Sequence, residues 1–232
     1  MSLFKIAISD QALDHLKQKL QVARLPDEID DASRRHTEKD GYDWRKHEKM
    51  LNDALPHFTM DIEVEGRGIL NIHYIYDVAN AIPLLLFVHG WPGSFLEVRK
   101  ILPLLASGTP SFHVVALGLP GYGFSEGTKM KGFDLSKYTE VGHRLMLALG
   151  YSEYGIFPAH SFRRLSSSYF MTVTQGGDWG HAITRNMAVT YGGQHIKAWH
   201  TNTLVYNTPP KILKSRLGGS ARYTMKRSGL YN

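Results

Sequence analysis

The amino-acid sequence predicts an α/β fold, in which a mostly parallel sheet carries helices on both of its faces. Two continuous apolar runs, residues 84–88 and 113–119, have the composition of buried strands, and each ends in a loop that contains glycine. From residue 84 to residue 201, strand-like and helix-like patterns alternate. This alternation is typical of parallel strands, because a parallel connection needs a crossover segment that is usually a helix.

The composition is that of a globular protein with room for one sizeable core. Of the 232 residues, 43% are hydrophobic and 21% are charged, and none is cysteine. The lack of cysteine excludes disulfides, thiolate metal sites and cysteine nucleophiles, and it fits a reducing compartment. The charged N-terminal stretch is no secretory signal, and the longest apolar run, residues 81–88, is too short to span a bilayer. We therefore expect a cytoplasmic protein without a transmembrane segment.

The formal net charge of +6 is concentrated in the C-terminal tail. Residues 211–232 contain six lysines and arginines and no acidic residue, so the rest of the chain is neutral. A short basic tail with glycine and serine is usually solvated rather than a recognition surface. We expect residues 205–232 to be disordered, and we expect no nucleic-acid partner.

The N-terminal region, residues 1–80, is expected to contain two helices and then a pair of strands. Ser9 and Asp10 offer capping oxygens ahead of an apolar stripe with helical spacing, and Pro26 ends that helix. The stripe consists of Leu13, Leu16 and Leu20. Residues 27–40 are almost wholly polar and form a predicted loop.

A second helical pattern in this region covers residues 42–55, and two strand patterns follow it. Apolar residues alternate with polar ones in residues 58–64 and again in residues 70–76, with a turn expected at residues 65–68. Period-two alternation predicts strands with one covered and one wetter face. These two runs are therefore expected to form an antiparallel pair at a sheet edge.

The core region, residues 81–204, is expected to alternate strands with helices. The strands are predicted at residues 84–88, 113–119, 172–175 and 196–201, and the helices at residues 95–105, 135–149 and 179–191. One stretch interrupts this pattern. Residues 155–171 contain paired arginines and three consecutive serines, a composition typical of a loop.

Asp178, in the sequence GGDWG, is the strongest candidate for a catalytic residue. It lies between a predicted strand and a predicted helix, and Gly176, Gly177 and Gly180 surround it. This is the small-x-nucleophile-x-small pattern of a nucleophile elbow, with aspartate where serine is usual. The glycines allow the sharp turn that holds the nucleophile up into a cleft. Taken alone, the same stretch also fits an ordinary surface turn.

Three loops follow the carboxyl ends of predicted parallel strands, where open α/β sheets place their ligands. They have the sequences HGWP at residues 89–92, LPGYGFS at residues 119–125 and GGDWG at residues 176–180. Together they resemble the epoxide hydrolases of the α/β-hydrolase superfamily, specifically the microsomal type. The N-terminal runs RLPDE, DWRK and NIHYI, which begin at Arg24, Asp43 and Asn71, are similar to the N-terminal domain of that family.

The resemblance implies a reaction at Asp178. Its carboxylate would open an epoxide and form an alkyl ester with the enzyme, and water would then release a diol. The backbone N–H groups of Trp91 and Trp179 would stabilise the oxyanion, Gly90 would serve as a loop glycine, and the bond between Trp91 and Pro92 would be cis. The implied partner is a small-molecule epoxide, and the chemistry needs neither a metal nor an organic cofactor.

The resemblance covers most of residues 4–210, and it also implies what this sequence lacks. The family's catalytic histidine and acid, and the tyrosines of its cap domain, would lie after residue 232. His89, His181 and His200 are expected to be structural rather than catalytic. We therefore expect an incomplete α/β-hydrolase fold that is inactive or reacts once. The resemblance also implies that residues 155–171 are an insertion, because in the family the preceding helix passes almost directly to the strand at residues 173–175. Together with the tail, these departures suggest the hypothesis of a mis-spliced or mis-predicted gene product.

Two other functions stay open. The sequence GGDWG is also similar to the haloalkane dehalogenases, which share the elbow and the aspartate, although the N-terminal region favours epoxides over alkyl halides. The third function is a non-catalytic fragment that uses the fold for binding or is merely degraded. The sequence identifies neither the epoxide nor the oligomeric state.

Overall fold

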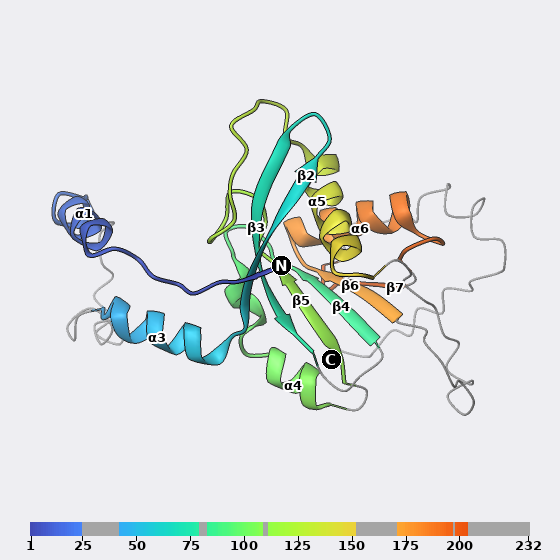
Figure 1. Cartoon of the computed structure of the whole chain (residues 1–232), viewed down its shortest axis with the longest axis horizontal. Coiled ribbons are helices and arrows are strands. Elements are labelled where there is room, and N and C mark those ends of the chain that lie inside the picture. The colour runs from blue at the N-terminus through green and yellow to red at the C-terminus, as the bar shows by residue number, and fades with distance from the viewer. Residues whose placement is uncertain (25–41, 79–82, 109–110, 152–170, 197, 204–232) are drawn as a thin grey trace, which may run out of the picture.

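A seven-stranded sheet runs through the centre of the molecule (Figure 1). The structure is a computed structural model that describes residues 1–24, 42–78, 83–108, 111–151, 171–196 and 198–203. Within these residues the strands are, in spatial order, β1 (Ser2–Leu3), β2 (His57–Val64), β3 (Gly68–Asp77), β5 (His113–Leu117), β4 (Pro83–Val88), β6 (Met171–Gly176) and β7 (Ala198–His200). The predictions for Pro26, the polar loop, the basic tail and all but the last residue of the insertion lie outside the described residues.

Helices lie on both faces of the sheet, which confirms the predicted α/β class (Figure 1). They are α1 (Asp10–Gln21), α3 (Trp44–Ala54), the 3₁₀ helix η2 (Phe95–Val98), α4 (Leu102–Ser107), α5 (Leu135–Ala148) and α6 (Trp179–Tyr191). The single helix predicted at residues 95–105 is wrong, because the chain forms η2 there and then begins α4 with Pro103 in its first turn. Proline lacks the N–H that would continue an earlier helix, but it needs none at a helix start.

The sheet has an antiparallel half and a parallel half. The strands β1, β2, β3 and β5 pair antiparallel, which confirms the predicted hairpin, and β5, β4, β6 and β7 pair parallel. In the parallel half, Val88 at the end of β4 is in register with Gly176 at the end of β6. The loops after these two strands therefore start side by side. This places the predicted elbow next to the sequence HGWP.

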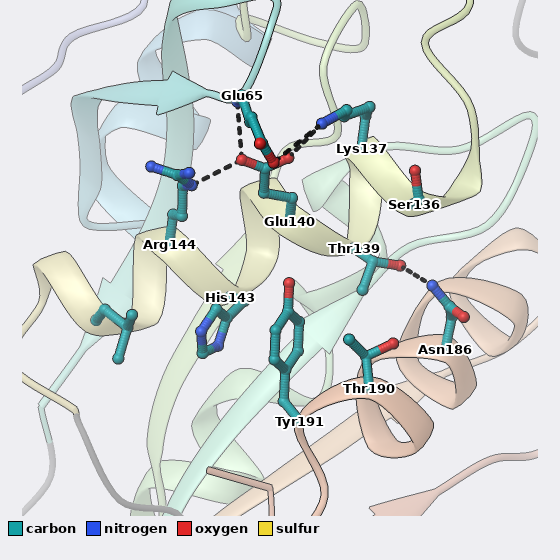
Figure 2. A pocket seen from close by; sticks show the side chains of 11 residues that line it. Glu65, Ser136, Lys137, Thr139, Glu140, His143, Arg144, Asn186, Thr190 and Tyr191 are labelled. Carbon is teal, nitrogen blue, oxygen red and sulfur yellow. Dashed lines mark hydrogen bonds and ion pairs between the residues drawn. The ribbon is translucent and has the colours of Figure 1, made fainter. Parts of the chain in front are cut away.

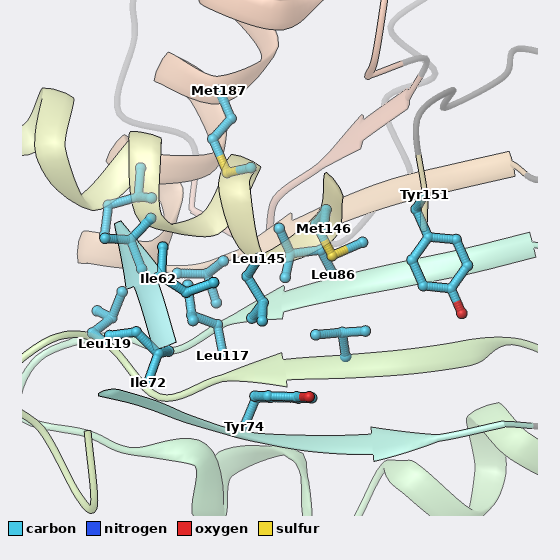
Figure 3. Close-up of a cluster of buried hydrophobic side chains, with 14 of the residues drawn as sticks. Ile62, Ile72, Tyr74, Leu86, Leu117, Leu119, Leu145, Met146, Tyr151 and Met187 are labelled. Atoms are coloured by element: carbon cyan, nitrogen blue, oxygen red, sulfur yellow. The ribbon is translucent and has the colours of Figure 1, made fainter. Parts of the chain in front are cut away.

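Apolar side chains form one layer on each face of the sheet. Successive residues of a strand point to opposite faces, and in β5 Val115 and Leu117 join one layer while Val114 and Ala116 join the other. The first layer packs against α5 and α6, as Figure 3 shows for Leu145, and the second packs against α3, η2 and α4. Each fully buried valine or leucine stabilises the fold by about 1.5–3 kcal/mol. The sheet is thus a firm base for the loops at its edge.

Helix α1 lies away from both layers (Figure 1). Ser9 is its N-cap, as predicted, because Ser9 Oγ accepts the N–H of Ala12 at 3.2 Å. None of its residues is buried, and Leu16 and Leu20 of the predicted stripe are 52% and 57% exposed. No part of the chain that the structure describes covers this stripe.

Of the described helices, none combines the length and the apolarity needed to cross a membrane. The cytoplasmic location and the domain boundaries at residues 80 and 204 stay predictions.

Candidate active site

Asp178 stands at the turn between β6 and α6, where it is the N-cap of the helix. Its φ of 51° is positive, which is true of no other non-glycine residue in the described ranges. For a residue with a Cβ, such a sparsely populated conformation costs about 1–3 kcal/mol. It persists only where neighbouring contacts hold it. The turn leaves Asp178 exposed at the carboxyl edge of the parallel strands.

Close approach of the backbone explains the glycines on both sides of the turn. A Cβ on Gly176 would lie 2.2 Å from the carbonyl oxygen of Gly180, and a Cβ on Gly180 would lie 2.1 Å from the carbonyl oxygen of Val88. Neither position can take a side chain unless the backbone moves. Gly177 also has a close neighbour, the side chain of Asn202.

Two backbone N–H groups hold one oxygen of the Asp178 carboxylate. The N–H of Trp91 donates to Oδ1 at 2.8 Å, and the N–H of Trp179 donates to the same atom at 2.6 Å. The approach of the first loop depends on Gly90, where a Cβ would lie 3.0 Å from the Cβ of Asp178. The two bonds, first that from Trp91 and then that from Trp179, lower the pKa of Asp178 because they favour its charged form. Oδ2 is left without a hydrogen bond from any described residue.

His89 braces the loop that carries Trp91. It is 0% exposed, its Nδ1 donates to the carbonyl of Gly90 at 2.9 Å, and its Nε2 accepts the N–H of Leu119 at 3.1 Å. Burial lowers the pKa of His89, so the ring stays neutral, as this pair of bonds requires. His89 thus joins the loops after β4 and β5, in line with the expected structural role. The bond between Trp91 and Pro92 is cis, as predicted.

Comparison with known proteins identifies the family of this fold and site. A family model described as "Epoxide hydrolase N terminus" matches residues 1–98, and one described as "alpha/beta hydrolase fold" matches residues 83–162. Epoxide hydrolase 1 of Oryctolagus cuniculus is 32% identical over 250 residues, which cover 95% of this chain and 50% of that protein. The chain belongs to the epoxide hydrolase family.

Further epoxide hydrolases show the same similarity. A putative epoxide hydrolase of Stigmatella aurantiaca is 33% identical over 80% of this chain and 41% of the relative. The solved structure of Aspergillus niger epoxide hydrolase matches with a TM-score of 0.66 at 29% identity, and the match covers 90% of this chain and 54% of that one. The chain spans about half the length of the curated relatives it matches.

The site of this epoxide hydrolase chain includes two residues that the sequence did not single out. The N–H of Asp178 donates to Thr203 Oγ1 at 3.2 Å, and the N–H of Gly90 donates to Glu97 Oε1 at 3.3 Å. Neither residue belongs to a motif, and a single threonine or glutamate contributes no periodic pattern that would mark it. The only signal that could have found them is the expected closeness of the loops after β4, β6 and β7.

The other histidines near the elbow are engaged elsewhere. His181 is buried, which lowers its pKa, and its Nδ1 lies 3.0 Å from Thr201 Oγ1. His200 Nδ1 bonds with Gln175 Oε1. No described histidine is hydrogen-bonded to the carboxylate of Asp178. The described residues also contain no group of three or more histidines, aspartates and glutamates that could hold a metal ion.

A polar groove of about 490 Å³ lies between α5 and α6, apart from this site (Figure 2). Glu140 in the groove pairs with Lys137 at 2.9 Å and with Arg144 at 2.8 Å, and it accepts the N–H of Glu65. The charges there are balanced within the groove. None of the predicted site residues lines it, so the elbow remains the candidate active site.

Proposed function

We propose that this chain opens an epoxide by nucleophilic attack of Asp178. The observation that carries the proposal is the pair of N–H donors on Oδ1, which favours the charged carboxylate and leaves Oδ2 to react. The side chains of Trp91 and Trp179 are 58% and 47% exposed. They offer apolar aromatic surface next to the carboxylate, which suits a hydrophobic epoxide.

In the first step, Oδ2 of Asp178 attacks a ring carbon of the epoxide. An ester C–O bond forms while the strained C–O bond of the ring breaks, and the resulting alkoxide takes a proton from water. The carbonyl oxygen of the ester is then Oδ1. It stays between the N–H groups of Trp91 and Trp179, so the product of this step needs no rearrangement of the donors.

The same donors serve the second step, in which water attacks the ester carbon of Asp178. Negative charge develops on Oδ1, and the two N–H groups are already in place to stabilise it. This step also needs a base that activates the water. Because no described histidine is bonded to Asp178, we propose that the 232-residue chain forms the ester but does not turn over repeatedly.

The test is covalent labelling of the purified chain with styrene oxide, followed by intact mass measurement and peptide mapping. We expect one adduct per chain, located at Asp178, and diol release that does not exceed one equivalent. The matched variant is Asp178→Asn, which keeps the shape of the side chain but not its charge, and it should lose the adduct. Equal labelling of Asp178→Asn would contradict the nucleophile, and continued diol release would contradict the single reaction.

A dehalogenase-like reaction would use the same aspartyl ester, so the elbow alone does not exclude it. The match of residues 1–98 to the N-terminal region of epoxide hydrolases supports the epoxide. If halide were released from a primary alkyl bromide faster than styrene oxide labels the chain, the alkyl halide would be favoured over the epoxide. If neither reagent labelled Asp178, the non-catalytic function would be favoured.

A further inference from the structure

Residues 201–203, which follow β7, contact the elbow directly. The N–H of Asp178 donates to Thr203 Oγ1 at 3.2 Å. This N–H precedes the first turn of α6, so no carbonyl of the helix can accept it. The hydroxyl of Thr203 in turn donates to Asn202 Oδ1 at 3.3 Å, and the Asn202 side chain fills the space beside Gly177. Thr203 therefore links the backbone of Asp178 to the side chain that lies beside Gly177.

Thr201 ties this segment to α6. Its Oγ1 accepts the N–H of Thr203 at 3.0 Å and donates to the carbonyl of Thr203 at 3.2 Å. Nδ1 of His181 lies 3.0 Å from the same oxygen. Because the single hydroxyl hydrogen points at the carbonyl, His181 is the donor to Thr201. The segment is thus bonded to the first turn of α6 at two places, Asp178 and His181.

We propose that Thr203 is a positioning residue for the nucleophile, an inference that rests on the proposed function of Asp178. The positive φ of Asp178 is unfavourable, and relaxation to an ordinary conformation turns the peptide plane that carries its N–H. The bond from this N–H to Thr203 Oγ1 opposes that rotation. It thereby keeps Oδ1 against the N–H groups of Trp91 and Trp179.

Thr203 holds the backbone of Asp178 and has no bond to its carboxylate. Its loss should therefore change how often the carboxylate is in the reactive arrangement, and not how well the epoxide binds. The expected effect falls on the rate of ester formation at saturating epoxide. The concentration that gives half of the maximal rate should change little.

The experiment compares Thr203→Val, which keeps the shape but removes the hydroxyl, with Thr203→Ser, which keeps the hydroxyl. Labelling by styrene oxide is followed by intact mass, and hydrogen exchange of the Asp178 amide is measured by NMR. For Thr203→Val we expect a maximal labelling rate about fivefold lower, the factor for one lost hydrogen bond, and faster exchange. Thr203→Ser should stay close to the parent. The control is Thr190→Val near the other end of α6, and thermal unfolding checks that all variants fold.

Each result decides one claim. If the parent chain is not labelled at Asp178, the proposed function fails, whatever Thr203 does. If the parent is labelled and Thr203→Val is labelled at the same rate, the positioning role is overturned while the proposed function stands. If Thr203→Val showed faster exchange of the Asp178 amide but no slower labelling, the bond to Thr203 would be only structural, and the inference would also be overturned. Failure of Thr203→Ser to restore the rate would show that the hydroxyl is not the relevant group.

Discussion

The candidate active site and the buried histidine pair on β2 and β3 contain titratable groups that are shifted for opposite reasons. Asp178 is exposed, and its pKa is lowered because two backbone N–H groups bind the charged form. His73 is 0% exposed, and its pKa is lowered to about 3, chiefly by burial and then by repulsion from the positive charge that His57 carries when it is protonated. One environment stabilises a charge, and the other excludes it.

Burial lowers the pKa of both histidines and favours neutral rings, and the hydrogen bonds then fix which nitrogens carry the hydrogens. His57 Nε2 lies 3.1 Å from the carbonyl of Leu51, which can only accept, so Nε2 carries the hydrogen and His57 Nδ1 does not. His73 Nε2, 2.9 Å from His57 Nδ1, must therefore donate. The rings of Phe4 and Phe95 pack around His73 at centroid distances of 5.1 and 4.7 Å. The pair joins β2, β3 and the end of α3 inside an aromatic shell.

The difference teaches that a shifted pKa does not by itself mark an active site. The histidine pair is closed in by aromatic rings, so it serves the packing of the sheet. Asp178 combines exposure, an unfavourable backbone conformation and two preorganised donors. These three features together, and not the pKa shift alone, support its assignment as the nucleophile.

The largest expected effect comes from breaking the close approach between α6 and β4 at Gly180, on which the elbow depends. In Gly180→Ala the new Cβ would meet the carbonyl oxygen of Val88 at 2.1 Å, so α6 must move off β4. We expect the free energy of unfolding in urea to fall by about 2–3 kcal/mol, and labelling of Asp178 to be lost.

The control for this change is Gly142→Ala on α5. Its nearest neighbour is the flexible end of the Met187 side chain at 3.3 Å, which can move aside. We expect a cost of less than about 1 kcal/mol, because alanine also favours the helix. Equal stability of Gly180→Ala and Gly142→Ala would mean that the contact with β4 does not hold the elbow.

Periodicity predicted most of the fold, because apolar spacing follows the geometry of helices and strands. It failed at residues 95–105, where Phe95, Val98 and Leu102 are buried as their spacing indicates, yet a new helix begins at Leu102 with Pro103 in its first turn. It also missed β1, because a strand of two residues cannot show alternation.

The site was predictable where its residues lie in contiguous motifs. Asp178, the glycines around it and the donors at Trp91 and Trp179 all belong to such motifs. Thr203 and Glu97 were not predictable, because both lie outside these motifs: Thr203 bonds to Asp178 from the segment after β7, and Glu97 bonds to Gly90 from η2. The histidine pair was missed for a related reason: each ring lies in an ordinary strand pattern, and only the register of β2 with β3 brings the two together.

The second largest effect is expected in the pH dependence of the free energy of unfolding, which tests the buried pair of His57 and His73. The pKa of folded His73, about 3, lies below its ordinary value of 6.5, so the unfolded chain binds the proton first as the pH falls. The contribution of the neutral His73 ring to the free energy of unfolding is therefore fully present above about pH 6.5. It is lost as the pH falls toward 3, by up to about 1.4 kcal/mol per pH unit for this one ring. His73→Gln, whose amide can still donate to His57, should make this slope shallower between pH 7.5 and pH 5.

Urea unfolding at several pH values measures the slope, so a general loss of stability in the variant does not obscure the result. The control is Asn71→Gln on the same strand, which changes no titratable group and should keep the slope of the parent. An unchanged slope in His73→Gln would show that the ring is not the buried neutral group described above. The buried pair could then no longer serve as the neutral counterpart of the charged Asp178.

The smallest effect is expected at Glu97, the exposed acceptor of the Gly90 N–H. At 3.3 Å the bond is long, and the loop is also held by His89, so Glu97→Ala should slow labelling of Asp178 by only about twofold. Glu97→Gln keeps an acceptor oxygen and should match the parent, as should the control Glu63→Ala on β2. A loss of labelling in Glu97→Ala as complete as that expected for Gly180→Ala would mean that one exposed contact governs the donors. The donors would then not be held by the loop as a whole, and the preorganisation that distinguishes the active site from the buried pair would be wrong.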